Sequence, residues 1–240
     1  MSVVPVAAIA ARRSEILETI ARAARSRDRD PAGVALMAVT KGHPAETVGN
    51  AARAGLTLFG ENRVQEGAAK IPAVRAEFPG LEWRLIGPLQ TNKAKTALQY
   101  FQVLESLDRE RLAARLETLL RGEEEARAVP VLIEVNLGKE PSKSGVFPED
   151  APALCEAALA CPHLEVRGLM AVPPFDEDPE ASRPYFRELL RLRDGLSEQF
   201  SHPLPELSMG MSHDYAVAVE EGATEVRVGT ALFGPREPQP

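Results

Sequence analysis

One pattern repeats along most of the 240 residues of this chain: a short apolar or β-branched run is followed by a stretch rich in Ala, Glu and Arg. This alternation is typical of βα units and a parallel sheet. Eight parallel strands with intervening helices favour a closed barrel over an open sheet, because closure leaves no unpaired edge. The eight runs lie at residues 34–40, 56–60, 83–87, 103–106, 131–137, 166–172, 207–211 and 226–232.

The sequence therefore predicts an α/β fold, a single TIM-type (β/α)8 barrel domain over residues 1–234. Apolar residues at 9, 16, 17 and 20 recur at helical spacing, which predicts an extra amphipathic helix over about the first 27 residues, packed outside the main body. Residues 235–240 alternate proline with polar residues and are predicted to form a disordered tail.

Composition excludes several classes of function. The 35 acidic residues outnumber the 28 basic ones, and the basic residues are scattered, so nucleic-acid binding is not expected. We expect no membrane span and no signal peptide, because no apolar run is long enough and no basic segment precedes the first apolar one. Cys155 and Cys161 fit neither a disulfide framework nor a metal site, which favours a reducing cytoplasm.

Lys41 closes the first apolar run and is followed by Gly42-His43-Pro44, so its amine is delivered where a buried strand ends. The other five lysines lie in polar helical or loop segments, and Lys41 is predicted to be the one that a packed scaffold holds still. Partly apolar surroundings lower the pKa of a lysine and favour the neutral amine that forms a Schiff base. The alternative is a strand-end lysine whose ammonium group extends into solvent.

Several other runs also end in polar or glycine residues that core packing does not require. In a parallel barrel all of these ends meet at one rim, where the sites of this fold lie. Each of them taken alone could be an ordinary turn or helix cap. Their joint placement predicts a site formed at that rim by Gly60-Glu61-Asn62, Glu105-Ser106, Asn136, Ser212 and Gly229-Thr230.

The last two runs favour a phosphate site. Residues 207–214 pass through small residues into a helix predicted to start near His213, so the Ser212 hydroxyl and free N–H groups are available to an anion. A plain helix cap by Ser212 is the alternative. Strand alternation directs Arg227 and Gly229 into the barrel, and a buried guanidinium requires an anion or acceptor. Phosphate sites in this fold commonly use the loops after strands seven and eight.

An aldehyde cofactor that carries a phosphate satisfies these features together, and pyridoxal phosphate is the candidate. Lys41 would bind the aldehyde carbon. Arg227 would donate to the pyridine nitrogen and leave it unprotonated, which weakens the ring as an electron sink. The remaining alternative is another phosphorylated metabolite, with Lys41 acting only as a charge.

Several motifs lie in order along residues 34–234. They are Ala38-Val39-Thr40-Lys41, Phe59-Gly60-Glu61-Asn62 with Gln65-Glu66, Ile86 to Lys93, Glu134-Val135-Asn136 with Lys143-Ser144-Gly145, Gly168-Leu169-Met170, Leu207 to Ser212 with Asp214, and Val226 to Thr230. Together they resemble the pyridoxal phosphate homeostasis protein family. The resemblance implies a single-domain barrel similar to the N-terminal domain of alanine racemase, with the cofactor on Lys41. It further implies phosphate contacts from Ser212, Gly229 and Thr230 with the Met211 backbone, a ring-nitrogen contact from Arg227, and Asn62 lining the pocket.

Two positions depart from that family. Arg84 stands where histidine is frequent, and we interpret it as a solvent-facing or rim arginine. Gly42 stands where threonine is common, and we expect it to loosen the turn after Lys41. Neither departure removes the lysine or the predicted phosphate ligands.

The resemblance implies a non-catalytic carrier, which binds pyridoxal phosphate reversibly, limits its free concentration and supplies apo-enzymes that depend on it. We expect a monomer rather than a dimer. The alternative is an amino-acid racemase of the alanine racemase type. Such racemases carry an extra β domain with an opposing tyrosine, whereas only residues 235–240 follow the predicted barrel domain here. Tyr100, Tyr185 and Tyr215 lie in no segment suited to that role. A partner subunit in a dimer could supply such a residue.

Overall fold

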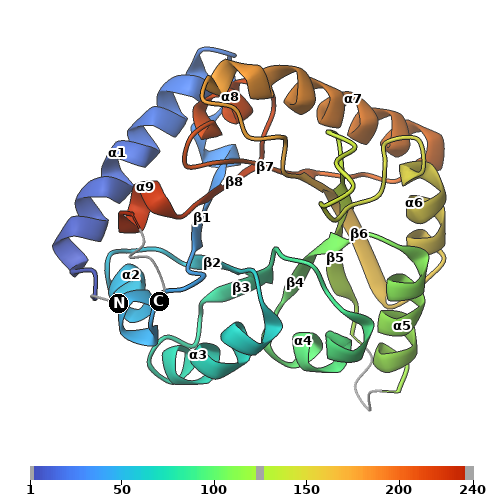
Figure 1. Ribbon diagram of the computed structural model, residues 1–240, viewed down its shortest axis with the longest axis horizontal. Coiled ribbons are helices and arrows are strands. Elements are labelled where there is room, and N and C mark those ends of the chain that lie inside the picture. The colour runs from blue at the N-terminus through green and yellow to red at the C-terminus, as the bar shows by residue number, and fades with distance from the viewer. Residues whose placement is uncertain (1–2, 123–126, 236–240) are drawn as a thin grey trace.

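The computed structural model describes residues 3–122 and 127–235. Its strands form one closed parallel barrel in which each strand pairs with the next along the chain and β8 returns to β1 (Figure 1). This confirms the predicted barrel. The strands are β1 (Ala35–Val39), β2 (Leu58–Glu61), β3 (Glu82–Leu85), β4 (Val103–Leu107), β5 (Val129–Val135), β6 (Leu164–Ala171), β7 (Glu206–Met211) and β8 (Glu225–Val228).

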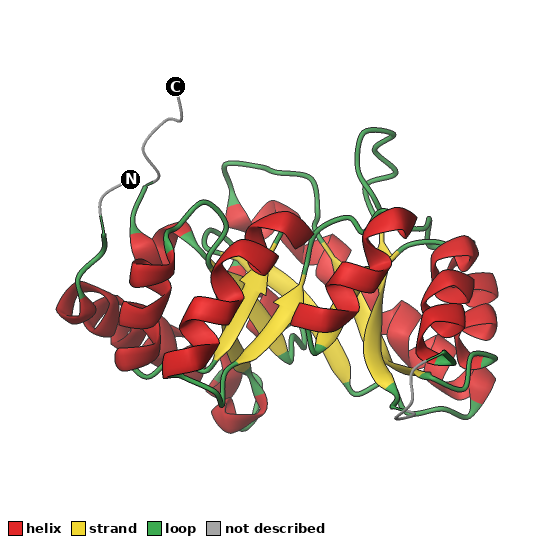
Figure 2. Ribbon diagram, turned by 90° about the horizontal axis from the view of Figure 1, so that it is seen from below, coloured by secondary structure: helices red, strands yellow, loops and turns green. Residues whose placement is uncertain are grey.

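A layer of helices surrounds the strands, which lie inclined within it (Figure 2). The extra N-terminal helix, α1, packs on α8, α9 and α2 outside the barrel, as predicted. No described helix is both long enough and apolar enough to cross a membrane. The α-helices are α1 (Val6–Arg25), α2 (Ala45–Arg53), α3 (Val64–Glu77), α4 (Ala94–Tyr100), α5 (Glu110–Leu120), α6 (Ala151–Leu159), α7 (Arg183–Phe200), α8 (Tyr215–Glu220) and α9 (Thr230–Phe233), with short 3-10 turns η1 (Pro31–Gly33), η2 (Thr91–Lys93) and η3 (Pro179–Ser182).

Two predicted boundaries were wrong. The eighth strand ends at Val228 rather than continuing to residue 232, and the apolar residues after Gly229 belong to α9, whose Leu232 and Phe233 pack in the outer core. The helix expected near His213 begins only at Tyr215, after a turn. The predicted tail over 235–240 lies outside the described residues apart from Pro235.

Apolar side chains are divided unequally between the two faces of the barrel. The large outer core lies between strands and helices and contains Phe59, Trp83 and Phe186, all fully buried. A much smaller cluster, Met37, Val39 and Leu58 with Ile86, is separate from that core. Strand alternation places this cluster inside the barrel. Much of the remaining interior is filled by polar and charged side chains. The candidate site lies in this polar part of the barrel.

Candidate functional site

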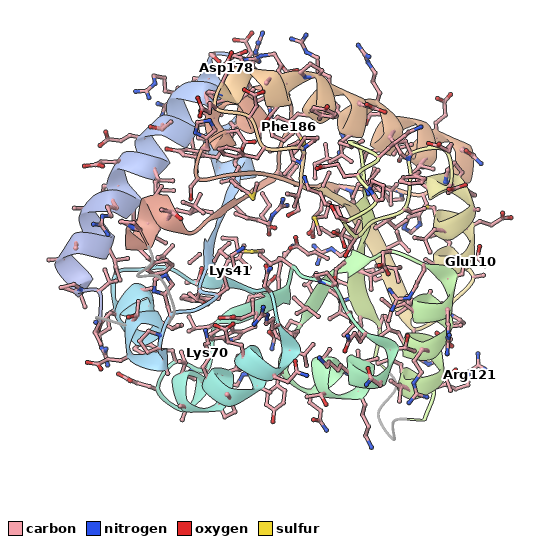
Figure 3. The ribbon with its side chains drawn as sticks, in the orientation of Figure 1. Lys41, Lys70, Glu110, Arg121, Asp178 and Phe186 are labelled. Atoms are coloured by element: carbon pink, nitrogen blue, oxygen red, sulfur yellow. The ribbon has the colours of Figure 1, made fainter. Side chains whose placement is uncertain are left out.

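Lys41 lies in the turn two residues beyond the end of β1, at the carboxyl end of the barrel. Figure 3 shows it inside the ring of helices. Its side chain is half-buried and lines a small pocket together with Val39, His43, Gly229 and Thr230. The chain ends of β1 and β8 meet here because the two strands pair directly. The structure therefore brings the predicted lysine and part of the predicted phosphate turn to one pocket.

A buried lysine that the sequence did not single out holds the Lys41 turn in place. Lys70 Nζ, on α3, donates to the backbone carbonyls of Thr40 at 2.9 Å and His43 at 3.0 Å, one on each side of Lys41. It also forms ion pairs with Glu61 at 2.8 Å and Glu66 at 2.9 Å. Lys70 is only 7% exposed, so the prediction that Lys41 is the one lysine held by the scaffold was wrong.

The turn after Lys41 is tight rather than loose. Gly42 has a φ of +75°, in the region that favours glycine, and its N–H donates to the carboxylate of Glu66. Glu61 is fully buried and accepts from the Thr40 hydroxyl. Burial raises the pKa of Glu61, although Lys70 opposes that rise. The expectation that Gly42 loosens this turn was therefore wrong, because the glycine conformation is fixed by Glu66.

Ser212 links the ends of β7 and β8. Its hydroxyl oxygen accepts hydrogen bonds from the backbone N–H groups of Gly229 at 3.1 Å and Ala231 at 3.2 Å. It does not cap the helix that follows it in sequence, but closes the turn that begins α9. Ser212, Gly229 and Thr230 thus form one polar turn beside Lys41.

Asp214 fixes the backbone of that turn on the β7 side. Its carboxylate accepts from the N–H of Met211 at 2.7 Å and from the Ser182 hydroxyl at 2.9 Å, and it is almost completely buried. Gly210, just before, has a φ of +89°, and a Cβ there would lie 2.5 Å from the Cβ of Ala218. The close approach of β7 to α8 therefore depends on glycine at 210.

Arg227 lies inside the barrel, as strand alternation predicted, and is 3% exposed. Its Nη1 donates to the Ser208 hydroxyl at 2.7 Å, and its Nη2 donates to the carbonyl of Ala171 at 2.7 Å. These two bonds tie the guanidinium to β7 and β6. The partner that an inward arginine requires is thus supplied in part by neighbouring strands.

Beneath Arg227 lies a buried charge network centred on Arg84. Arg84 is 7% exposed, and its Nη1 lies 2.6 Å from Glu206, 3.3 Å from Glu105 and 3.1 Å from Glu225. The interpretation of Arg84 as a rim arginine was wrong, because it points inward among carboxylates from three other strands. Burial opposes the charge of Arg84, but those carboxylates raise its pKa above the ordinary value.

Ser208 links Arg227 to Arg84. It bonds directly to Arg227 and reaches Arg84 through the carboxyl groups of Glu105 and Glu225. Its hydroxyl lies 2.6 Å from Glu105 and 2.8 Å from Glu225, and it already accepts from Arg227. A hydroxyl carries one hydrogen and can donate to only one of the two carboxyl groups. The second carboxyl group can bond to the Ser208 hydroxyl oxygen only if that carboxyl group is itself protonated. Burial and the neighbouring Glu105 raise the pKa of Glu225 well above its ordinary value, so the Glu105 and Glu225 pair shares this proton.

Glu134 is a further buried carboxyl group close to Arg227. It is 8% exposed, and its Oε2 makes no hydrogen bond to any described residue. Burial and the charge of Asp108 raise the pKa of Glu134 to about 7, and Arg227 opposes that rise. Glu134 therefore changes charge near neutral pH.

Asn62 follows β2 at the same rim, but it is not among the residues that line the pocket beside Lys41. Glu105 was predicted at the rim, but it lies within β4 and belongs to the buried network around Arg84. The other residues predicted to contact the cofactor come together in two neighbouring groups. Lys41, Gly229 and Thr230 share the pocket, while Ser212, Met211 and Arg227 surround its β7 and β8 side.

Comparison with known proteins agrees with this architecture. Residues 16–237 match the model of the alanine racemase N-terminal domain. Alanine racemase from Corynebacterium glutamicum superposes with a TM-score of 0.69 at 19% identity, covering 96% of this chain and 62% of the racemase, which shows a common fold.

Two relatives share much more of the sequence. A pyridoxal phosphate homeostasis protein from Aquifex aeolicus is 45% identical over 226 residues, which cover 94% of this chain and 97% of the relative. PipY from Synechococcus elongatus, solved with pyridoxal phosphate bound, is 37% identical with a TM-score of 0.82, covering 94% of this chain and all of PipY. The chain therefore belongs to the pyridoxal phosphate homeostasis protein family, whose barrel is that of the alanine racemase N-terminal domain.

Proposed function

We propose that this protein binds pyridoxal 5'-phosphate as a Schiff base on Lys41 and serves intracellular homeostasis of the cofactor without turning over a substrate. The observation that carries the proposal is that Lys41 shares a pocket with Gly229 and Thr230, whose turn is closed by the Ser212 hydroxyl. An amine and a turn rich in hydrogen-bonding groups thus line the same pocket. The structure of PipY with bound pyridoxal phosphate supports this ligand.

The residues present fit the proposed cofactor. The N–H groups of Gly229 and Ala231 already bond to an oxygen, that of Ser212, and are donors suited to a phosphate ester. Ser212, Gly229 and Thr230, with the Met211 backbone, would hold the phosphate, while Lys41 would hold the aldehyde carbon. When bound, pyridoxal phosphate supplies an aldehyde that condenses reversibly with an amine, and a ring that can accept electrons.

Arg227 would contact the ring nitrogen from inside the barrel, and Asn62 would line the pocket from β2. The Arg227 guanidinium is held by Ser208 and Ala171, so it is fixed in position before any ligand arrives. An arginine stays protonated and donates to a ring nitrogen without transferring a proton. This arrangement disfavours carbanion chemistry and supports a carrier.

The positions of the three tyrosines also favour a carrier over a racemase. Tyr100, Tyr185 and Tyr215 all pack against the outer core between strands and helices, and none is among the residues that line the Lys41 pocket. A racemase needs a second acid or base on the face of the ring opposite its lysine. We propose that the protein acts in the cytoplasm as a monomer and supplies pyridoxal phosphate to apo-enzymes that require it.

The first test is a titration of the purified protein with pyridoxal phosphate, followed by visible absorbance. We expect a yellow band that borohydride bleaches, with one equivalent bound per chain. A phosphorylated metabolite that bound through charge alone would give no visible band.

A turnover assay separates the carrier from the racemase. Alanine and serine should show no racemisation above the buffer control across a series of protein concentrations. Turnover that rises with the square of protein concentration would instead indicate a dimeric racemase and would overturn the carrier proposal.

A further inference from the structure

A second polar cleft opens at the carboxyl end of the barrel, on the rim of β3 and β4. It is a shallow hollow, open to solvent, with a volume of about 770 Å³. It shares no lining residue with the Lys41 pocket. One wall is formed by the segment after β3, and the other by the start of α5. The segment after β3 belongs to the motif Ile86 to Lys93, which contributes no residue to the Lys41 pocket. The cleft is lined by Gln90, Thr91, Asn92, Arg109, Arg111 and Arg115.

Arg109 joins the two walls. Its Nη2 donates to the carbonyl of Leu89 at 2.9 Å and lies 3.4 Å from the Thr91 hydroxyl, and its Nη1 pairs with Asp108. The Arg109 guanidinium is therefore fixed at the base of the cleft by three groups. A charge that is held in this way is positioned in advance for a ligand.

Arg111 and Arg115 stand one helical turn apart on the exposed side of α5. Neither forms an ion pair with another described residue. Like charges at this spacing disfavour a helix. Arg121, just after α5, is paired with Glu117, whereas Arg111 and Arg115 have no such carboxylate beside them in the described part of the chain. No acidic residue lies three or four positions C-terminal to either arginine. An external anion would relieve this repulsion.

The charge of the cleft is opposite to that of the whole protein. Residues 90–95 and 108–115 contain five basic and two acidic side chains, whereas the chain carries a formal net charge of −7. Such a local reversal attracts anions to one part of the rim. Figure 3 shows Glu110, at the start of α5, on the far side of the ring from α1, with Lys41 closer to the centre.

The lining also indicates the size and kind of anion. No aromatic or aliphatic side chain among the described residues lines the cleft. It therefore lacks the apolar anchors of a protein interface and a platform on which a nucleobase could stack. Guanidinium groups bind phosphate through paired hydrogen bonds, and the carboxamides of Gln90 and Asn92 can donate or accept beside it. We infer that this cleft is a binding site for a phosphate-bearing small molecule, separate from the cofactor pocket and independent of its proposed function.

The test uses pyrophosphate as the probe, with the full-length protein at low ionic strength. Isothermal titration calorimetry should show saturable binding, and amide shifts in ¹⁵N spectra should move at residues 90–92 and 109–115. The double variant Arg111→Ala/Arg115→Ala should weaken binding at least about tenfold, and Arg111→Lys/Arg115→Lys should fall between it and the parent, because lysine keeps the charge but loses the paired geometry.

The matched control is Arg25→Ala/Arg191→Ala, which removes two exposed arginines from other helices and should leave binding unchanged. Malonate, a dianion without phosphate, should bind more weakly than pyrophosphate. The inference would be overturned by binding that does not saturate, by equal binding of malonate, by shifts confined to residues 212 and 229–231, or by an equal loss in the control variant.

Discussion

The Arg227 guanidinium donates a 2.7 Å hydrogen bond to the hydroxyl of Ser208 inside the barrel. Through Ser208 the arginine at the proposed ring contact is connected to Glu105 and Glu225, and through them to Arg84 near the other end of the barrel. The orientation of Arg227 therefore depends on residues that lie well below the pocket.

Replacing Ser208 tests this connection. Ser208→Ala removes an acceptor from Arg227 and leaves the neighbouring carboxyl groups without their bridging hydroxyl. A buried polar group left unpaired costs about 1–3 kcal/mol, so the free energy of unfolding should fall by that amount in urea denaturation. Ser14→Ala, on the exposed side of α1, should change stability by less than about 0.5 kcal/mol. Equal stability of the two variants would contradict the bridging role.

Glu134 should make stability depend on pH. Its pKa is raised from 4.5 to about 7, so between these values the folded protein holds a proton that the unfolded chain has released. The Glu134 contribution to the free energy of unfolding therefore falls as pH rises through this window, by up to about 3 kcal/mol, and is constant above it.

Glu134→Gln removes this titration without changing the shape of the side chain. The variant should match the parent near pH 4 and be more stable at pH 8, as measured by urea unfolding at both values. The difference between variant and parent excludes the separate contribution of Glu61, whose pKa is also raised by burial. The effect of the Asp108 charge on Glu134 is part of what is measured. A difference that does not change with pH would show that Glu134 does not titrate in this range.

Lys70→Met should destabilise the protein strongly. It removes the cation beside Glu61, which is fully buried, and releases both carbonyls that flank Lys41. Breaking a buried ion pair by removing one partner costs about 3–5 kcal/mol.

The double variant Lys70→Met/Glu61→Gln should recover part of that loss, because the fully buried carboxylate is removed and only Glu66, which is partly exposed, is left without its cation. The loss in the single variant should also be smaller at pH 5 than at pH 8, since Glu61 without Lys70 takes up a proton more readily. Guanidinium denaturation at both pH values measures these effects. A double variant no more stable than the single one would show that backbone contacts, and not charge, dominate.

Two glycines should respond oppositely to alanine. At Gly210 a Cβ meets Ala218 at 2.5 Å in a left-handed backbone conformation, so Gly210→Ala should lower the melting temperature. At Gly195, in α7, no atom lies within 4 Å of the added carbon, so Gly195→Ala should raise stability by about 0.5–1 kcal/mol. Thermal unfolding of both variants provides the comparison, and a neutral Gly210→Ala would contradict the tight contact between β7 and α8.

The sequence was sufficient for the barrel and for part of the site. In a closed parallel barrel every strand ends at the same rim, and the first and last strands are neighbours. Locating Lys41 at the end of the first strand and a small-residue turn at Gly229 in the last one was therefore enough to bring them together. Periodicity could not locate the end of β8, because the apolar residues after Gly229 suit a strand as well as the turn of helix that they form.

The roles of Lys70 and Arg84 were missed from the sequence, because each is held by ion pairs with carboxylates that lie on other elements. Lys70 lies in a helix among polar neighbours, but Glu61 at the end of a buried strand required a cation, and Glu66 lies four residues before Lys70. Arg84 was misplaced because its strand was considered alone. Only the combination of inward carboxylates on β4, β7 and β8 shows why an arginine is stable there.

The central claim is that Lys41 is the residue that holds the cofactor, and peptide mapping tests it most directly. Protein incubated with pyridoxal phosphate, reduced with borohydride and digested should yield the modified peptide at Lys41, measured by mass spectrometry. Lys41→Ala should abolish the adduct, while the control Lys139→Ala, at an exposed lysine paired with Glu149, should retain it. An adduct mapped to another lysine, with Lys41 unmodified, would contradict the account.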